Sequence, residues 1–378
     1  MEGENILNCE GIKTISLFSG AGGMDFGAEV AGANIIFAND NDSDACLTLK
    51  NYFPNTTVVG GDIAQVDSFP NAEFVIGGYP CQSFSLGGNR NPVKDSRTYL
   101  YLHFARCLTS VSPKYFIAEN VSGLKGLAAG AFMEAQITAF EKAGKYGYHI
   151  VHHVVDAKDY GIPQTRRRLL IVGVRKDLKK EFSFPAPTHG KSVAKNSKLC
   201  PYASHGDAIA DLPLWPEGEF YERPHDPEGN FAWYYMSRNR KAPWDMPSYT
   251  IVANWRHVTL HPASPVMKLT WSNLSDGFKQ RWDFSEEYEH IVQHPERPIL
   301  KKPRRLSWRE CARIQTFPDG FEPVGDVESK FNQIGNAVPP RLAEVIVRHL
   351  LSGKGLVEVK AKSITGDIAV QRQLNLLE

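Results

Sequence analysis

The first half of the chain alternates short apolar runs with stretches long enough for helices, and this alternation constrains the fold more than any other feature. The apolar runs have strand length, are rich in Ile, Val and Phe, and cover residues 14–18, 35–38, 74–76, 115–118 and 169–174. Helix-length stretches such as 24–31 and 42–52 separate them. Strands that alternate with helices predict βαβ units, and therefore a doubly wound α/β fold on a parallel sheet that is covered on both faces.

The length of 378 residues is enough for two or three domains. The residue composition changes near residue 185. Beyond that point Pro, Trp, Tyr and His become frequent and the periodicity fades. Residues 335–352 return to a helical pattern, which Pro339 and Pro340 open near its first turn. We therefore predict a larger α/β domain of residues 1–184, completed by residues 330–378, and a smaller, mixed, loop-rich domain of residues 185–329.

Composition excludes several classes of protein. With 42% hydrophobic and 22% charged residues, the chain is neither globally disordered nor fibrous. Six cysteines without a Cys-x-x-Cys pair argue against a disulfide scaffold and a zinc ribbon, so no metal site is expected. The acidic N-terminus lacks the apolar core of a signal peptide, and no apolar run approaches the ~20 residues of a membrane span. We expect a soluble cytoplasmic protein.

Charge is distributed unevenly along the chain. Residues 1–80 carry 2 basic and 11 acidic side chains, a net charge of −9, whereas 81–163 carry +3 and 164–378 carry +7, which sum to the formal +1. An acidic first segment suits a neutral or cationic small ligand, and a basic remainder suits a polyanion. Ordinary solvated surface charge is the alternative.

Glycine or a short polar residue follows each of the early strands, at the sheet edge where doubly wound folds bind ligands. Gly20, Gly22 and Gly23 follow the first strand, and Asp40 ends the second, about 20 residues later, where an acid suits ribose hydroxyls. The pattern is Gly-x-Gly-Gly, and no lysine accompanies it for a phosphate. This favours a nucleoside without phosphates over NAD or ATP, although a tight structural turn remains the alternative.

Three further positions have side chains suited to chemistry. Cys81 follows a proline at a strand-to-loop turn, where a thiol pKa can be lowered, but a buried small hydrophobe is the alternative. Glu119 ends an apolar strand, so burial would raise its pKa unless it serves as a helix cap. Arg166 and Arg168 alternate along a strand and share one face, where they would hold a phosphate and a base carbonyl, unless they form a solvated basic edge.

Six motifs in order resemble those of the bacterial-type DNA (cytosine-5) methyltransferases of restriction-modification systems. They are FSGAGG at 18–23, GGYPCQSFS at 77–85, ENV at 119–121, QTRRR at 164–168, RRLSWRECARIQTFP at 304–318 and QIGNAVPP at 333–340. The departures are small: Tyr79 replaces the usual Pro or Phe, Asp40 the commoner Glu, and Ser307 the usual Thr. None of them removes a reactive group.

The resemblance implies S-adenosylmethionine as cofactor and a covalent mechanism. Cys81 would add to C6 of a flipped-out cytosine, Glu119 would contact N3 and the exocyclic amino group, Arg168 would contact O2, and Arg166 would support the same end of the base. The matching cofactor positions are Phe18 (adenine stacking), Ser19, Gly20, Gly22, Gly23, Asp40 (ribose), Asp62 (adenine amino group), Ile63, Pro80, Leu100, Asn336 and Val338.

The same resemblance makes residues 185–329 a target-recognition domain for double-stranded DNA. Within it, residues 231–257 combine a net charge of +3 with interleaved aromatic residues. Candidate DNA-binding residues are Gln82, Ser85, Arg97, Arg238, Arg240, Thr250 and Arg256, and the segment 83–97 resembles the family's mobile active-site loop. The family implies a monomer, and a cognate restriction endonuclease that acts on the same site without a stable complex. The target sequence is not readable from these residues.

Two alternative functions share this fold. One is a tRNA cytosine-5 methyltransferase, which the long aromatic and basic insert disfavours. The other is a non-catalytic DNA-binding regulator, which the presence of both the glycine loop and Cys81 disfavours.

Overall fold

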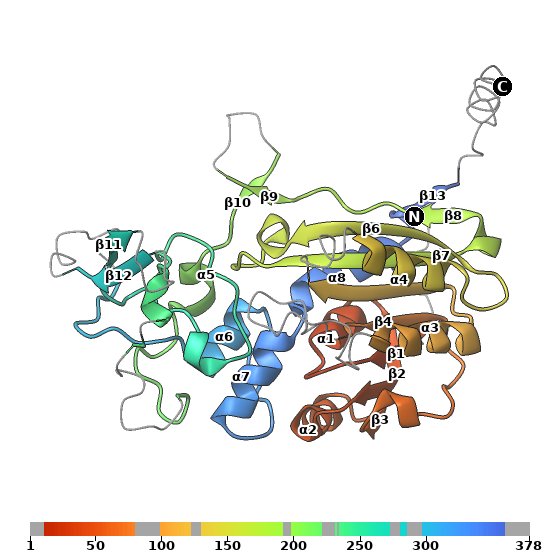
Figure 1. Cartoon of the computed structure of the whole chain (residues 1–378), viewed down its shortest axis with the longest axis horizontal. Coiled ribbons are helices and arrows are strands. Elements are labelled where there is room, and N and C mark those ends of the chain that lie inside the picture. The colour runs from red at the N-terminus through yellow and green to blue at the C-terminus, as the bar shows by residue number, and fades with distance from the viewer. Residues whose placement is uncertain are drawn as a thin grey trace, which may run out of the picture.

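A seven-stranded sheet forms the centre of the computed structural model, which describes residues 11–79, 99–121, 130–191, 198–220, 231–232, 234–272, 280–285 and 297–359. The strand order is β3-β2-β1-β4-β5-β7-β6 (Figure 1). The strands are β1 (Ile12–Leu17), β2 (Ala33–Asp40), β3 (Thr57–Gly60), β4 (Phe74–Gly77), β5 (Tyr115–Val121), β6 (Tyr148–Asp156) and β7 (Arg167–Arg175). The predicted doubly wound α/β fold is confirmed.

The prediction of a wholly parallel sheet was wrong for one strand. β1 to β5 pair in parallel, but β7 is antiparallel to both β5 and β6. The connection from β6 to β7, residues 157–166, is too short for the crossover of a dozen or more residues that parallel neighbours require. Strand β6 itself was not predicted, because His152 and His153 interrupt its apolar pattern.

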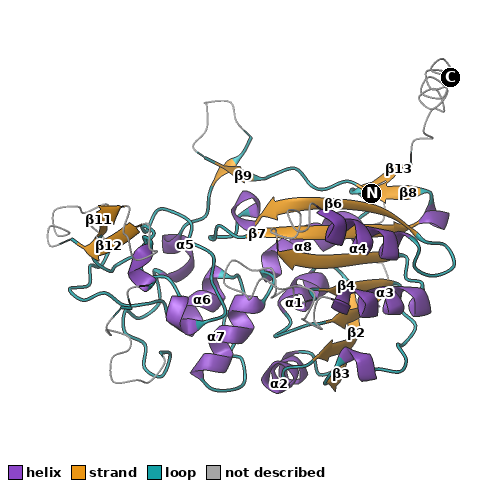
Figure 2. Cartoon of the chain, in the orientation of Figure 1, coloured by secondary structure: helices purple, strands orange, loops and turns teal. Residues whose placement is uncertain are grey.

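Helices cover both faces of the sheet, which gives three layers (Figure 2). On one face α3 (Leu100–Val111) and α4 (Ala131–Glu141) pack through Phe104 and Phe140. On the other face α1 (Gly23–Val30) and α8 (Pro340–Leu351) pack over β2, β4 and β7. Helix α2 (Ser43–Tyr52) lies beside β2 and β3. The sheet is therefore covered on both faces, as its apolar strands predicted.

Helix α8 packs directly on α1, although more than 300 residues separate them. A Cβ atom at Gly27 would lie 2.1 Å from the carbonyl oxygen of Pro340, so only glycine permits this approach of the two helices. Nearby, β13 (Leu356–Glu358) pairs with β8 (Lys180–Phe182). Helix α8 thus completes the helical layer that α1 begins on this face of the sheet.

The second region, to the left in Figure 1, has little regular structure, as its sequence predicted. It contains β9 (His189–Gly190), β10 (Cys200–Pro201), α5 (His205–Ile209), the antiparallel hairpin of β11 (Met267–Ser272) and β12 (Gln280–Phe284), α6 (Trp308–Ile314) and α7 (Val327–Asn336). A separate, aromatic-rich core holds it together and includes Trp244, Trp255 and Trp308. The domain limits at residues 185 and 330 stay a prediction.

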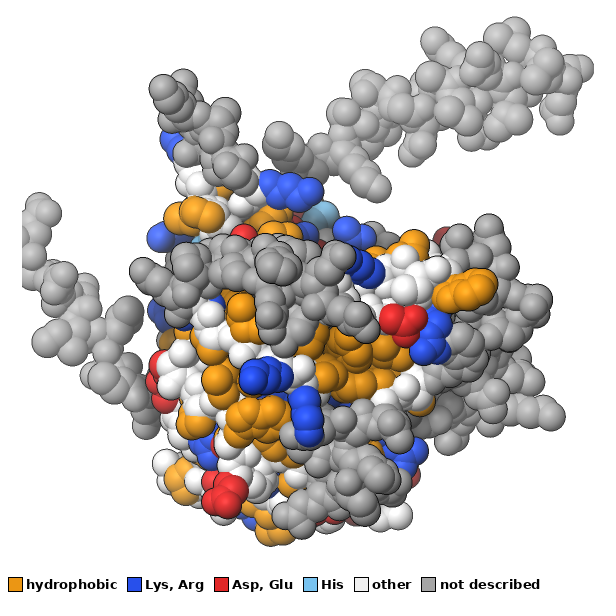
Figure 3. Space-filling view, turned by 90° about the vertical axis from the view of Figure 1, so that its left-hand side faces the viewer, with side chains coloured by type: hydrophobic (Ala, Val, Ile, Leu, Met, Phe, Trp, Pro, Cys, Tyr) orange, Lys and Arg blue, Asp and Glu red, His pale blue; other side chains and the backbone are white. Residues whose placement is uncertain are grey.

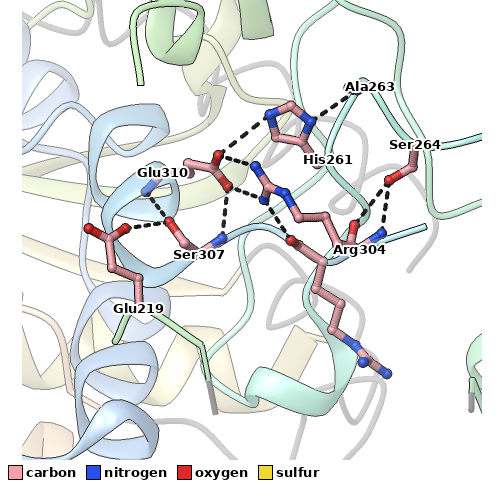
Figure 4. A network of polar contacts seen from close by, with 8 residues as sticks. Glu219, His261, Ala263, Ser264, Arg304, Ser307 and Glu310 are labelled. Carbon is pink, nitrogen blue, oxygen red and sulfur yellow. Dashed lines mark hydrogen bonds and ion pairs between the residues drawn. The ribbon is translucent and has the colours of Figure 1, made fainter. Parts of the chain in front are cut away.

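A buried network of ion pairs and hydrogen bonds connects segments of this region (Figure 4). Arg304 donates two hydrogen bonds to the Glu310 carboxylate, at 2.8 and 2.7 Å, and both side chains are almost wholly buried. Ser307 caps α6 through Glu310 and also donates to Glu219 at 2.8 Å. The Nδ1 atom of His261 accepts from the backbone N–H of Ala263, so the ring proton is on Nε2. This Nε2 atom lies 3.4 Å from Glu310 Oε1. The network ties three chain segments to the start of one helix.

Within the described residues, no helix is long and apolar enough to cross a membrane. The same residues contain no group of three or more His, Cys, Asp or Glu side chains arranged to hold a metal ion.

Candidate active site

A cavity of about 1020 Å³ opens at the carboxyl ends of β1, β2, β4 and β5. Its volume suits a ligand of nucleoside size with room for a second group. Of the predicted site residues, the structure brings twelve described ones to its wall: Phe18, Ser19, Gly20, Asp40, Asp62, Ile63, Leu100, Glu119, Arg168, Thr250, Asn336 and Val338. The wall therefore draws on residues that lie more than 300 positions apart in the sequence.

The loop after β1 takes a strained course that exposes its backbone to the cavity. Phe18 has φ 55°, a left-handed conformation that non-glycine residues rarely adopt, and Gly20 has the same φ. The backbone N–H of Gly20 donates to Asp40 Oδ2 at 2.7 Å, and Asp42 N–H donates to Oδ1 at 2.9 Å. Burial raises the pKa of Asp40 while these two bonds oppose the shift. Asp40 thus fixes the glycine loop as well as facing the ligand.

Gly22 and Gly23 do not line the cavity, and their role is packing. A Cβ at Gly23 would lie 2.4 Å from the carbonyl oxygen of Val338, and one at Gly22 would lie 2.7 Å from the Phe53 ring. Gly23 therefore allows the start of α1 to pack against the turn after α7 that carries Val338, and Gly22 allows it to pack against Phe53.

The far wall comes from the ends of β3 and the start of α3. Asp62 is exposed and accepts from the backbone N–H of Ala64 at 2.9 Å. Ile63 is buried beside it, and its carbonyl oxygen accepts from Arg106 Nη2 at 2.7 Å. Leu100 is the first residue of α3 and adds an apolar contact. This wall offers one carboxylate and an apolar surface, as an adenine base requires.

Glu119 and Arg168 form an ion pair at the base of the cavity, from the neighbouring strands β5 and β7. Arg168 Nε lies 2.7 Å from Glu119 Oε1, and both side chains are largely buried. Burial raises the pKa of the Glu119 carboxyl, as its apolar strand predicted, while Arg168 opposes the shift. Gly78 leaves room for this carboxyl, because a Cβ there would lie 2.9 Å from Oε2.

Arg166 lies just before β7, and its environment differs from that of Arg168, the second residue of that strand. Its side chain is fully buried, and it is absent from the described wall of the cavity. Its guanidinium donates to the carbonyl oxygens of Ile251 at 2.8 Å, Gly335 at 2.8 Å and Ala337 at 2.7 Å. Arg166 therefore acts as a positioning residue that ties the second region and the α7–α8 turn to the sheet. A direct contact of Arg166 with a base stays a prediction.

Gln164 extends the same junction. Its Oε1 accepts from Ile251 N–H at 2.9 Å, and its Nε2 donates to Gln315 at 3.0 Å. Thr250 donates to the carbonyl oxygen of Thr165 at 2.7 Å, on the edge of the cavity. The QTRRR segment thus holds the two regions together around the site.

The predicted residues of the next segment, Pro80, Cys81, Gln82, Ser85 and Arg97, lie outside the described residues. In the sequence, Cys81 comes two residues after Tyr79, which lines the cavity.

The other candidate DNA-binding residues differ in exposure. Arg238 and Arg256 are exposed, and the Arg256 guanidinium lies 5.2 Å from the centre of the Trp255 ring. Arg240 instead turns inward, donates to the carbonyl oxygen of Tyr235 at 3.1 Å and stacks on that ring. Figure 3 views this end of the molecule and shows apolar side chains exposed among Lys and Arg. Trp271, 61% exposed, is an aromatic side chain of this region that sequence reasoning missed.

The chemistry of the cavity wall fits a cationic nucleoside. Its carboxyl groups come from Asp25, Asp40, Asp42, Asp62 and Glu119. Arg168 is the only Lys or Arg among the described residues of the wall, and it is paired with Glu119. Phosphates would meet repulsion there, whereas a sulfonium and an ammonium group would be attracted. S-adenosylmethionine combines both cations with adenosine, and the residues present fit it.

Asp25 is a site residue that sequence reasoning missed. It lies in the first turn of α1, is fully buried and lines the cavity. Neither of its carboxyl oxygens has a hydrogen-bond partner within the described residues. Burial raises its pKa to about 7. In the sequence, the position of this acid between the apolar Met24 and Phe26 was the one indication that it is buried.

We expect Asp25→Asn to flatten the pH dependence of stability in the ligand-free protein. A carboxyl group whose pKa is raised on folding binds more protons in the folded state between about pH 4 and 7, so wild-type stability falls as pH rises through that window. The variant should therefore be more stable than wild type by about 4 kcal/mol at pH 8 and nearly equal to it near pH 4. Urea unfolding at both pH values measures this. Parallel curves for the two proteins would contradict it.

The fold and the site together define an α/β methyltransferase whose cavity lies at the strand ends. Comparison with known sequences then gives the family. The chain matches the C-5 cytosine-specific DNA methylase family over residues 12–352, and it belongs to that family. It is a DNA cytosine-5 methyltransferase.

Relatives and solved structures agree with this assignment. The chain is 35% identical over 374 residues to the type II methyltransferase M.BsuRI of Bacillus subtilis, covering 89% of this chain and 78% of the relative. It is 35% identical over 345 residues to M.NgoPII of Neisseria gonorrhoeae, covering 88% and 93%. A DNA modification methyltransferase from an E. coli prophage has the same fold, with a TM-score of 0.63 and 23% identity over 90% of this chain and 99% of that one.

Proposed function

We propose that this enzyme transfers the methyl group of S-adenosylmethionine to C5 of a flipped-out cytosine in duplex DNA, through a covalent adduct between Cys81 and C6. The observation that carries the proposal is the Glu119–Arg168 pair at the base of an acidic, nucleoside-sized cavity. A carboxyl and a guanidinium from neighbouring strands match N3 and O2 on one edge of cytosine. The cofactor supplies an electrophilic methyl group on a sulfonium.

The steps follow from the properties of the ring. C5 of cytosine is a weak nucleophile, so the Cys81 thiolate first forms a bond to C6. The C5–C6 π electrons shift toward C4 and N3, and the ring becomes an enamine that is nucleophilic at C5. Glu119, with its raised pKa, donates a proton or hydrogen bond at N3, and Arg168 stabilises the charge at O2. C5 would then take the methyl group with this electron pair, the electrons of the S–CH₃ bond would remain on the cofactor sulfur as a neutral thioether, and the N3 proton would return to Glu119. A base removes the C5 proton, the double bond re-forms, and the Cys81 thiolate leaves.

A cytosine stacked in a duplex is out of reach of this cavity, so the base has to leave the helix. Extrusion costs a few kcal/mol, which contacts from the DNA-binding residues offset. Arg238 and Arg256 are exposed and suit phosphate or base contacts. Arg240 suits such a role less well because its guanidinium is engaged within the region's own core.

The wider role proposed here follows the names of the relatives. M.BsuRI and M.NgoPII are type II methyltransferases. We infer that this chain is the modification enzyme of a restriction-modification system, acting as a monomer in the cytoplasm. A cognate restriction endonuclease would act on the same site without a stable complex.

Glu119→Gln should lower kcat by about 10²- to 10³-fold while leaving cofactor affinity within about threefold of wild type. The amide keeps the size of the carboxyl but offers no proton to N3, and it leaves Arg168 without its ionic partner. Single-turnover methyl transfer and calorimetric titration of the cofactor measure the two quantities. A variant with wild-type turnover would remove Glu119 from the reaction.

Base-resolution mapping of 5-methylcytosine tests the proposed function. Plasmid DNA from cells that express the chain should carry methylcytosine within one short motif, and DNA from cells that express Cys81→Ala should carry none. Methylation of tRNA without methylation of plasmid DNA would replace the DNA substrate by an RNA one. If folded protein that binds the cofactor methylates neither DNA nor tRNA, the result would favour a non-catalytic DNA-binding regulator.

A further inference from the structure

Tyr79 follows β4 two residues before Cys81 in the sequence, and its side chain is buried at the cavity wall. It is 4% exposed and packs in the apolar cluster between the sheet and the α3–α4 layer. Its ring centre lies 6.1 Å from that of Phe104 and 6.5 Å from that of Phe140. The phenol is the one polar group that this residue brings into the cluster, so it requires a partner there.

That partner is Gln136, from the middle of α4. The Tyr79 hydroxyl donates to Gln136 Oε1, and the Gln136 side chain is fully buried. Gln136 Nε2 has no partner within the described residues. Burying an amide among aromatic rings costs free energy unless the amide is hydrogen-bonded. The bond from the Tyr79 hydroxyl therefore lowers the cost of burying Gln136. None of the six motifs contains Gln136.

Tyr79 also touches the two parts of the site that flank Cys81. Its carbonyl oxygen accepts from Asn120 Nδ2 at 3.4 Å, next to Glu119 on β5. Its ring meets the edge of Phe18 with centres 6.3 Å apart, on the adenine side of the cavity. The residue therefore has fixed neighbours in the cofactor wall, in the acid strand and in α4.

We propose that Tyr79 and Gln136 form a positioning pair that sets the location of the Cys81 thiolate relative to Glu119. The inference rests on the proposed covalent role of Cys81. The bond to α4 fixes the depth of the Tyr79 side chain in the core, and Cys81 follows after only one intervening residue. A displacement of 1 Å at a nucleophile is enough to slow its attack by about 100-fold, so a small shift of this anchor has a measurable effect.

The test separates positioning from stability by comparing single and double variants. Tyr79→Phe removes the donor to Gln136 Oε1 and Gln136→Met removes this acceptor of the Tyr79 hydroxyl, whereas the double variant removes both groups and leaves a core of similar volume. We expect each single variant to lower kcat about 10-fold, with KM for DNA and cofactor within about twofold. In the double variant the unfolding temperature should return toward wild type while kcat stays low.

The rate of covalent trapping on DNA that contains 5-fluorocytosine is the direct readout. Fluorine at C5 cannot leave as a proton does, so the Cys81 adduct accumulates after methyl transfer. Trapping should slow in all three variants. Tyr148→Phe is the matched control, because Tyr148 is buried in the same cluster, donates to the Pro113 carbonyl at 2.9 Å, and pairs at the far end of β7 with Arg175. It should trap at the wild-type rate.

Each contrary result has a distinct meaning. If the double variant recovers kcat together with stability, or if Tyr79→Phe traps at the wild-type rate, the positioning role is overturned while the covalent mechanism stands. If the wild type itself does not trap fluorinated DNA, the covalent mechanism fails, and the inference fails with it. Gln136→Met leaves Tyr79 intact, so the question is answered even if Tyr79→Phe does not fold.

Discussion

Cys81→Ala should abolish methyl transfer, with a loss in kcat of at least about 10⁴-fold. Without the thiolate, C5 of cytosine stays a weak nucleophile, and the described part of the cavity wall contains no other cysteine. Cofactor affinity should change little, because the wall that fits the nucleoside comes from β1, β2, β3 and the α7–α8 turn. Single-turnover transfer of a radiolabelled methyl group, together with a binding titration, measures both effects.

Cys200→Ala is the matched control for this experiment. Cys200 is an exposed free thiol in the second region, so its loss should leave turnover unchanged. Loss of activity in both variants would point to general damage rather than to a nucleophile. Substantial turnover by Cys81→Ala would refute covalent catalysis.

Arg166→Met should lower the free energy of unfolding by about 3 kcal/mol and weaken cofactor binding at least about tenfold. Methionine fills much of the same volume but leaves the carbonyl oxygens of Ile251, Gly335 and Ala337 without their donors in a buried site. The turn that carries Val338 should then lose its fixed position against the cavity. Chemical denaturation and calorimetric titration measure the two losses.

Arg167→Met, at the next residue along the chain, provides the comparison. The Arg167 side chain is 70% exposed, and its ion pair with Asp156 spans 3.5 Å, so its removal should cost well under 1 kcal/mol. If the two variants unfold alike, the three carbonyl bonds of Arg166 contribute little and the junction is held by other contacts.

Much of the fold was predictable because glycine and apolar residues leave local patterns. The alternation of apolar runs with helix-length stretches predicted five of the strands and both faces of the sheet. Gly20 and Asp40 were placed together from the rule that strand ends meet at one edge, and the structure joins them at 2.7 Å. Strand β6 was missed because an edge strand tolerates polar residues such as His152 and His153.

The rest of the site depended on burial, which spacing does not reveal. Arg166 and Arg168 have the same side chain and share a face, yet one is bonded only to backbone carbonyls and the other to Glu119 at the cavity. Asp25 was missed because its position between Met24 and Phe26 does not show that it is fully buried at the cavity wall. The Tyr79–Gln136 contact joins two segments that no motif connects.

The cavity wall extends from Ser16 to Val338, and this has a consequence for protein synthesis. At about 5–20 residues per second, a ribosome makes the two ends of that wall roughly 15 to 65 s apart. During this interval the growing chain has its glycine loop but lacks the turn that closes the pocket, so it cannot hold the methyl donor. A product that terminates before the turn that carries Val338 lacks part of this wall, and we therefore expect it not to methylate DNA.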